Sequence, residues 1–353
     1  MAKRRMIAVI YLTAAGKSVA ERLAAGWDQE SLEVIAAGSS LSSQVRSLWD
    51  EYESFIFIMA VGIVVRLIAP LLKSKWDDPG VVVVDEGGHF AVSLVGGHWG
   101  GSNALARQVA ALLGAVPVIT TATDVQGKPA LDNLAKQWGM LPLPRERVKE
   151  ANSAFLAGER VVIYTEWDLQ LADENGIEVL PLARHTEHQS GFPVFVTSRE
   201  HSQFSNKGVC LCPPSLSAGI GCKRGVSAEE ILGALEEALK RSGRNRDGLA
   251  VLASHEIKAD EVGLREAAAR WKLPLVFYGT EVLKEIHEQH SYLADSNFVR
   301  ERTGVGGVCE TAALAAAAEG KLVLSKMKMG RVTVALAEAG LLWSESGQAI
   351  RRI

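Results

Sequence analysis

The chain has 353 residues, which is more than one compact core usually accommodates, and this length predicts two or three domains. Its formal net charge of −3 argues against a dedicated nucleic-acid binder, which would carry a strongly basic face. No run of the sequence approaches the ~20 apolar residues needed to cross a membrane, so we expect a cytoplasmic protein with no membrane partner. The 33 glycines and 6% aromatic residues favour an α/β chain with many tight turns.

Strands and helices alternate through the first 140 residues and predict a doubly wound, Rossmann-like sheet. Two apolar runs, Val81–Val84 and Phe90–Val95, flank an acidic, glycine-rich turn, which indicates a hairpin and therefore at least one antiparallel strand. The other expected elements of this region are strands at 6–12, 32–36, 55–60 and 117–121 and helices at 16–25, 63–72 and 102–114.

The pattern weakens at 140–150, which predicts a boundary. We expect an N-terminal domain over 1–140, a small middle α/β unit over 141–214 and a separate α+β C-terminal domain over 215–353. Pro213-Pro214 ends the middle unit. The expected elements of the last domain are strands at 217–222, 249–254, 322–325 and 331–337 and helices at 227–241 and 308–319.

Two of the four cysteines, Cys210 and Cys212, alternate within an apolar run and so project from one face of a predicted strand. Metal-binding pairs more often have a two-residue spacer and a second pair downstream. We therefore expect buried, reduced thiols and no protein-bound metal.

The segment from Ser93 to Asn103 predicts a strand, then a loop, then a helix capped by Ser102 or Asn103. The loop contains Gly96, Gly97, Gly100 and Gly101. Helix N-termini attract anions, and glycines let a ligand approach the backbone closely. The loop matches neither the P-loop nor the dinucleotide fingerprint. It predicts either a ligand-binding loop or only a tight turn.

His98 lies inside this loop, where it is either a ligand-contacting residue or a structural one. The segment Thr120–Asp124 follows the next strand, and Thr121, Thr123 and Asp124 could bind polar substituents or orient a histidine. The alternative is that Thr123 or Asp124 caps a helix.

Arg66 is expected in the first turn of an apolar helix, where the helix dipole disfavours a cation, so it should face an anion. That anion is either a ligand or the pair Asp85 and Glu86. Because ligands gather at the carboxyl ends of parallel strands, we expect loops 61–63, 96–101 and 121–124 at one edge of the sheet.

Two basic clusters lie near strand ends of the last domain: Lys223 with Arg224, and Lys326 with Lys328. Such clusters are usually solvated surface, but these two could also converge on a polyanionic ligand.

Together these segments resemble the CbiG family, the cobalt-precorrin-5A hydrolases of anaerobic cobalamin biosynthesis. The segments that carry the resemblance are Val61–Pro70, Val81–Glu86, Gly96–Asn103, Pro117–Asp124, Gly219–Gly225, Ser254–Asp260, Phe298–Gly304 and Lys326–Ala335. The match is weak over 140–210. The chain departs from the family pattern at some positions, such as Gly96, where the family often has serine, and Ser325, which replaces a proline. These departures leave His98, Asn103, Thr121 and Asp124 in place.

The resemblance implies water attack on a δ-lactone of cobalt-precorrin-5A, release of acetaldehyde and formation of cobalt-precorrin-5B. We assign water activation to His98, with Asp124 as the alternative base, and oxyanion binding to Asn103 and the loop N–H groups. The substrate's carboxylates are assigned to Arg66, Lys223, Arg224, Lys326 and Lys328. The substrate carries the cobalt, so no protein-bound cofactor is expected. A homodimer and transient contact with neighbouring pathway enzymes are left open.

Two other classes of function stay open on the sequence alone. The last domain resembles a stand-alone corrin-pathway domain, so the chain could be a non-catalytic corrinoid carrier. Alternatively, the glycine loop could bind a sugar phosphate or nucleotide in a transferase.

Overall fold

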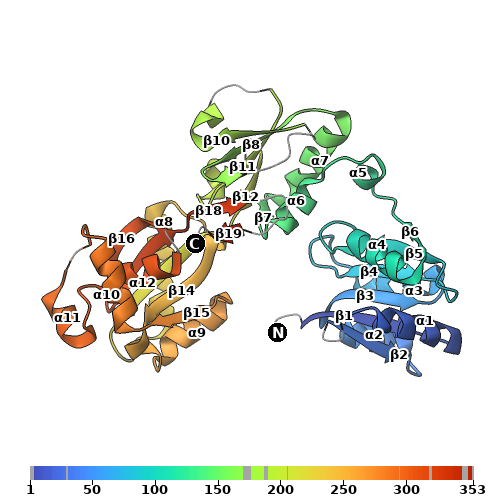
Figure 1. Cartoon of the computed structure of the whole chain (residues 1–353), viewed down its shortest axis with the longest axis horizontal. Helices are drawn as coiled ribbons and strands as arrows, with labels where there is room; N and C mark the ends of the chain where they lie inside the picture. Colours follow the sequence, from blue (N-terminus) through green and yellow to red (C-terminus); the bar gives the residue numbers. More distant parts are fainter. Residues whose placement is uncertain are drawn as a thin grey trace. The chain divides into compact units, whose positions relative to one another are not determined.

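The computed structural model describes residues 4–28, 31–169, 176–186, 190–204, 206–293, 295–317, 320–343 and 349–351. By its internal contacts the chain divides into two compact units, Met1–Asn133 and Leu134–Ile353. Figure 1 shows the elements of both units, coloured along the sequence. Among the described residues, none of the helices has the length and apolar character that a membrane span requires.

The first unit is a six-stranded sheet in the order β2-β1-β3-β4-β5-β6, which confirms the doubly wound α/β prediction. One buried cluster packs α1 and α4 against one face, and a second packs α2 and α3 against the other. The elements are β1 (Arg4–Tyr11), α1 (Ala14–Ala25), β2 (Leu32–Ala36), α2 (Leu41–Leu48), β3 (Tyr52–Ile58), α3 (Val61–Ile68), β4 (Gly80–Val84), β5 (Phe90–Val95), α4 (Ser102–Leu113), β6 (Val116–Val118) and α5 (Ala122–Val125).

The predicted hairpin is present, and it sets the direction of the last two strands. Strands β1 to β4 are parallel, β5 runs antiparallel to β4, and β6 is parallel to β5. Loops 96–101 and 121–124 therefore lie at the edge opposite to loop 61–63. The expectation of a single shared edge was wrong, because the hairpin reverses the chain before the glycine loop begins.

Asp85 holds the turn of this hairpin. Its carboxylate accepts the backbone N–H groups of Gly87, His89 and Phe90, at 3.1, 2.8 and 2.7 Å, and contacts Nδ1 of His89 at 3.0 Å. Partial burial raises the pKa of Asp85, but these hydrogen bonds outweigh burial and lower it below its ordinary value. The charge of Asp85 is thus compensated locally.

Arg66 lies in the last turn of α3, not in the first, because the helix begins at Val61 and ends at Ile68. A cation near a helix C-terminus is favoured by the dipole, so the argument that Arg66 must face an anion loses its premise.

The second unit contains two larger sheets, with strand orders β10-β8-β11-β12-β7 and β15-β14-β13-β17-β16. Every strand of the first lies between 141 and 212, and every strand of the second between 216 and 338. Its elements are α6 (Leu131–Gln137), which begins in the first unit, β7 (Leu141–Leu143), α7 (Val148–Ala157), β8 (Val161–Thr165), β9 (Asp168–Leu169), β10 (Ile177–Pro181), β11 (Phe192–Val196), β12 (Val209–Cys212), β13 (Leu216–Cys222), α8 (Ala228–Ser242), β14 (Leu249–His255), α9 (Val262–Trp271), β15 (Leu275–Tyr278), α10 (Thr280–Gln289), α11 (Asn297–Thr303), α12 (Val308–Ala317), β16 (Lys321–Met329), β17 (Val332–Glu338), β18 (Leu341–Trp343) and β19 (Ala349–Arg351).

These two sheets are joined by polar contacts within the unit. Arg244, after α8, contacts Glu338 of β17 at 3.2 Å and Glu166, after β8, at 3.8 Å, and Glu338 also accepts a hydrogen bond from Ser198. Strand β18 pairs with β9. The middle and C-terminal regions therefore share one compact unit, and the domain boundaries at 140/141 and 214/215 stay predictions.

The cysteine prediction is confirmed for Cys210 and Cys212, which lie on β12 as free, buried thiols. Burial raises the pKa of each to about 12, so both are protonated and unreactive at neutral pH. The predicted helix 308–319 is present as α12, and its residues 318–319 lie outside the described part of the chain. The predicted strand 322–325 is present as part of β16, which is longer than predicted.

Helix α12 packs directly on the centre of the C-terminal sheet at Gly219. A Cβ atom at Gly219 would lie 1.8 Å from the backbone oxygen of Cys309 and 2.5 Å from the backbone nitrogen of Ala313. We predict that Gly219→Ala lowers the free energy of unfolding of the second unit by ~3 kcal/mol, because helix and strand must separate.

The control is Gly233→Ala in α8, where an added Cβ would meet nothing within 4 Å. It should leave stability unchanged or raise it by about 0.5–1 kcal/mol. Urea unfolding of both variants measures the difference, and equal stabilities would contradict the proposed close packing.

Candidate functional site

The glycine loop closes the N-terminus of α4 with its own carbonyl groups. The N-cap is Gly101 in the left-handed conformation with φ 85°, and not Ser102 or Asn103 as predicted. The backbone N–H groups of Ser102 and Asn103 donate to the carbonyl oxygens of Gly96 and Gly97, each at 3.1 Å. These donors are therefore already satisfied within the protein.

The loop glycines allow the loop backbone to pack closely against itself and against Asn103. A Cβ at Gly97 would lie 3.1 Å from Asn103 Oδ1, and one at Gly100 would lie 2.8 Å from the carbonyl oxygen of Gly96. The geometry fits the tight-turn alternative, and the ligand contacts predicted for Gly97, Gly100 and Gly101 stay predictions.

His98 is held between two aspartates. Its Nε2 lies 2.8 Å from Asp124 Oδ2, and its Nδ1 lies 3.1 Å from Asp132 Oδ1. Thr123 Oγ1 is also within 3.2 Å of Nε2. The side chain of His98 is only 7% exposed, so neither ring nitrogen is open to solvent in this geometry.

Asn103, Thr121 and Asp124 extend the same network. Asn103 Nδ2 donates to Thr121 Oγ1 and to Asp124 Oδ2, each at 2.9 Å, while its Oδ1 accepts from Ser93 Oγ at 2.7 Å. Arg107 donates to Asp124 Oδ1 at 2.6 Å. The structure thus brings together the sequence-predicted His98, Asn103, Thr121, Thr123 and Asp124.

The two carboxylates determine the charge state of His98. Burial lowers its pKa, but the hydrogen bonds and negative charges of Asp132 and Asp124 outweigh burial and raise the pKa above its ordinary value. For Asp124, burial raises the pKa, whereas Arg107 and His98 together bring it below its ordinary value. Pairing with two carboxylates favours the protonated form of His98, and water activation by His98 would require one of these pairs to open.

Two members of the network, Asp132 and Arg107, were missed by the sequence analysis. Arg107 follows Asn103 by four residues on α4, a spacing that puts both on one helix face and could have been noticed. Asp132 lies in a stretch without a glycine or histidine motif, and only the folded chain shows its contact with His98.

The predicted basic residues divide into paired and unpaired groups. Lys326 and Lys328 lie two residues apart on β16, on the face opposite the buried Met327. Lys223 follows β13 close to the β16–β17 turn, where its backbone N–H donates to the backbone carbonyl oxygen of Arg331. Within the described part of the chain, these three lysines have no ion-pair partner. Arg224 differs, because it pairs with Asp260 at 2.7 Å.

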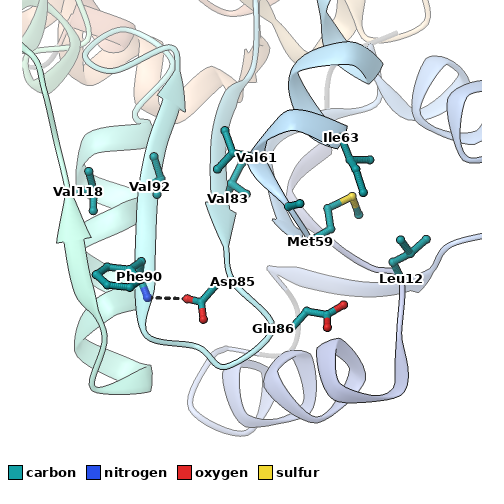
Figure 2. A pocket seen from close by; sticks show the side chains of 11 residues that line it. Leu12, Met59, Val61, Ile63, Val83, Asp85, Glu86, Phe90, Val92 and Val118 are labelled. Atoms are coloured by element: carbon teal, nitrogen blue, oxygen red, sulfur yellow. Dashed lines mark hydrogen bonds between the residues drawn. The ribbon is translucent and has the colours of Figure 1, made fainter.

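A cavity of about 570 Å³ opens at the other edge of the first sheet, by the carboxyl ends of β1, β3 and β4 (Figure 2). Its walls are mostly apolar, and Asp85 and Glu86 supply carboxylates. The lining residues are Leu12, Met59, Ala60, Val61, Ile63, Val83, Asp85, Glu86, Phe90, Val92 and Val118. The sequence analysis missed this cavity, although the ends of strands 6–12 and 55–60 gave its position.

Within the described residues, no group of three or more His, Cys, Asp or Glu side chains is arranged to hold a metal ion. The expectation that cobalt arrives with the substrate stays a prediction.

Comparison with known proteins identifies the family. Three family models match consecutive parts of the chain: "Cobalamin synthesis G N-terminal" over 43–124, "Cobalamin biosynthesis central region" over 129–213 and "Cobalamin synthesis G C-terminus" over 216–337. A cobalt-precorrin-5A hydrolase from Salmonella typhimurium is 35% identical over 354 residues, covering 96% of this chain and 99% of that protein. The chain belongs to the CbiG family.

A second CbiG-family relative, the cobalt-precorrin-5A hydrolase of Priestia megaterium, is 32% identical and covers 88% of this chain and 85% of its own length. Among solved structures, a cobalamin biosynthesis protein G homolog from Sulfolobus solfataricus matches 95% of this chain and 97% of its own, with 23% identity and a TM-score of 0.41.

We predict that His98 stabilises the first unit most below its unfolded-state pKa of about 6.5, and that this stability is lost as pH rises through the higher pKa of the folded state. His98→Asn removes the buried cation between Asp124 and Asp132, which then rely on Arg107 and Lys75 as ion-pair partners. It should cost ~3 kcal/mol in urea unfolding at pH 6 and clearly less at pH 9.

His89→Asn is the matched control, because His89 also contacts an aspartate but its side chain is 75% exposed. It should cost less than ~1 kcal/mol. If His98→Asn costs no more than His89→Asn at pH 6, the buried ion network is not a stabilising element.

Proposed function

We propose that this chain is a cobalt-precorrin-5A hydrolase of anaerobic cobalamin biosynthesis. One observation carries the proposal: 35% identity to a protein of that name extends over 99% of the relative's length. The match covers the N-terminal, central and C-terminal regions together, so it supports the activity of the whole protein rather than of one domain.

The reaction that the family implies is the opening of a δ-lactone. Water adds to the lactone carbonyl carbon, the ester C–O bond breaks, and a free carboxylate and a hydroxyl form. The hydroxyl then loses its proton, its carbon leaves as acetaldehyde, and the electron pair of the broken C–C bond passes to the conjugated ring and its cobalt. We expect no further cofactor, because the substrate brings the metal.

The substrate is an anion with several carboxylates, and Lys223, Lys326 and Lys328 are suited to bind them. Lys223 is distant in sequence from Lys326 and Lys328, but the pairing of β13, β17 and β16 brings all three lysines toward the same end of the C-terminal sheet. Arg224 can contribute only by exchanging its contact with Asp260. Carboxylates distant from the reacting bond are held alike in the ground and transition states, so these residues should act on KM.

The catalytic roles predicted for His98, Asn103 and Asp124 stay predictions. The hydrogen bonds of this network support a positioning role, since the amide of Asn103 and both ring nitrogens of His98 are engaged with protein groups. The expected cytoplasmic location, and a homodimer or transient contact with neighbouring pathway enzymes, also stay predictions.

The first test of function is the release of acetaldehyde from cobalt-precorrin-5A by the purified chain. We expect stoichiometric acetaldehyde and conversion to cobalt-precorrin-5B under multiple-turnover conditions. Binding of the corrinoid without acetaldehyde would instead support the carrier alternative. Binding of a sugar phosphate or nucleotide without binding of any tetrapyrrole would support the transferase.

The second test concerns the three unpaired lysines. Replacing Lys223, Lys326 and Lys328 with glutamine should raise KM about tenfold at low ionic strength and change kcat little, and added salt should shrink the effect. The control replaces three other exposed lysines, Lys207, Lys240 and Lys272, and changes the net charge equally. An equal rise in KM for both triple variants would assign the effect to net charge alone.

A further inference from the structure

The cavity lies where the topology of the first sheet predicts a ligand. In the order β2-β1-β3-β4, the chain leaves β1 toward β2 on one side and leaves β3 toward β4 on the other. The loops after β1 and β3 therefore diverge, and ligands of open α/β sheets bind in the crevice at such a point. Leu12 follows β1 and Met59 follows β3, and both line the cavity.

Several of the apolar side chains that line the cavity remain exposed. Leu12 is 46% exposed, Val61 40%, Ile63 39% and Phe90 50%. Leaving such a cluster in water is unfavourable, and a ligand with an apolar face would bury it. A volume of about 570 Å³ is within the range of small-molecule sites.

The two acidic residues of the rim differ in what they can do. Both oxygens of Asp85 already accept hydrogen bonds of the hairpin turn. Glu86 Oε1 accepts a hydrogen bond from Thr13 Oγ1 at 2.8 Å, and its Oε2 has no partner within the described residues. Figure 2 shows Glu86 between Asp85 and Leu12. Glu86 is thus an anchored carboxylate with one oxygen available.

We infer that this cavity binds the lactone-bearing edge of the corrinoid ring, and that Glu86 is the general base that activates the hydrolytic water. The inference rests on the proposed function. Its physical basis is charge: the lactone is a neutral ester, whereas free acetate and propionate side chains are anions. An apolar cavity with an anionic rim accepts the first and repels the others.

A water molecule between Glu86 Oε2 and the lactone carbonyl transfers a proton to the carboxylate while its oxygen bonds to the carbonyl carbon. The tetrahedral intermediate collapses, the ring C–O bond breaks, and Glu86 returns the proton to the departing oxygen. The new carboxylic acid releases its proton to solvent, so the product has one carboxylate more than the substrate, and Glu86 repels it, which favours release.

Arg66 gains a different role from the one that its sequence position suggested. It lies three residues after Ile63 on α3, and residues at this spacing are neighbours on a helix surface. A ring seated against Ile63 would bring its outward carboxylates within reach of Arg66. This placement depends on the cavity and not on the helix dipole.

Glu86→Gln is the central test, since glutamine can still accept the hydrogen bond of Thr13. With cobalt-precorrin-5A as the probe, kcat should fall by about 10²- to 10⁴-fold, the usual contribution of a general base. Inhibition by cobalt-precorrin-5B should become stronger, because the repulsion of the new carboxylate is gone. Glu53→Gln, at the opposite end of β3, is the control and should match wild type.

The ring contact has its own matched pair on α3. Ile63 and Val65 are 39% and 45% exposed, but of the two only Ile63 lines the cavity. Ile63→Gln should weaken corrinoid binding about tenfold, as measured by the change in its visible absorbance, and Val65→Gln should not.

If wild type releases no acetaldehyde, the proposed function fails and the inference fails with it. If wild type is active while Glu86→Gln keeps a normal kcat, or if Ile63→Gln and Val65→Gln bind alike, only the inference is overturned.

Discussion

The antiparallel pairing of β4 and β5 divides the N-terminal sheet into two edges with different chemistry. Asp85 fixes the turn between these strands by accepting three backbone N–H groups. Because the chain reverses there, the carboxyl ends of β1, β3 and β4 lie on one side of the sheet, and the carboxyl ends of β5 and β6 lie on the other. The cavity and the histidine network are therefore separate features of one domain.

The two edges also differ in whether their polar groups have hydrogen-bond partners within the protein. In the network around His98, the imidazole, the amide of Asn103 and the carboxylate of Asp124 all have protein partners. Such a closed arrangement fixes the glycine loop and α4 in place. At the cavity, apolar side chains are exposed and one oxygen of Glu86 is unpartnered within the described residues. Ligand binding would therefore gain more free energy at the cavity than at the histidine network.

The sequence predicted the doubly wound sheet, the hairpin and the cluster of His98, Asn103, Thr121 and Asp124, because periodicity and glycine loops are local signals. It wrongly predicted loop 61–63 beside loops 96–101 and 121–124. The rule that ligand loops gather at the carboxyl ends applies to parallel strands, but the hairpin makes β5 and β6 run opposite to β3. The sequence also put Arg66 in the wrong turn of α3 because helix ends are weakly encoded. Asp132 could not be found from local patterns, as its contact with His98 spans more than thirty residues.

The cavity could have been predicted in part. The ends of β1 and β3 were recognisable, but Leu12, Met59 and Ile63 look like ordinary core residues in a sequence. Only the structure shows that some of these side chains stay exposed and surround a carboxylate. Family membership indicates the reaction, and the sheet topology indicates which edge of the first unit should carry it.

Amide hydrogen exchange with and without bound corrinoid tests this account most directly. Using the Glu86→Gln variant, so that the lactone persists, cobalt-precorrin-5A should slow exchange in segments 12–16, 59–64 and 85–91, and leave 96–103 unchanged. Protection of 96–103, with none at 59–64, would place the substrate at the histidine edge and contradict the account.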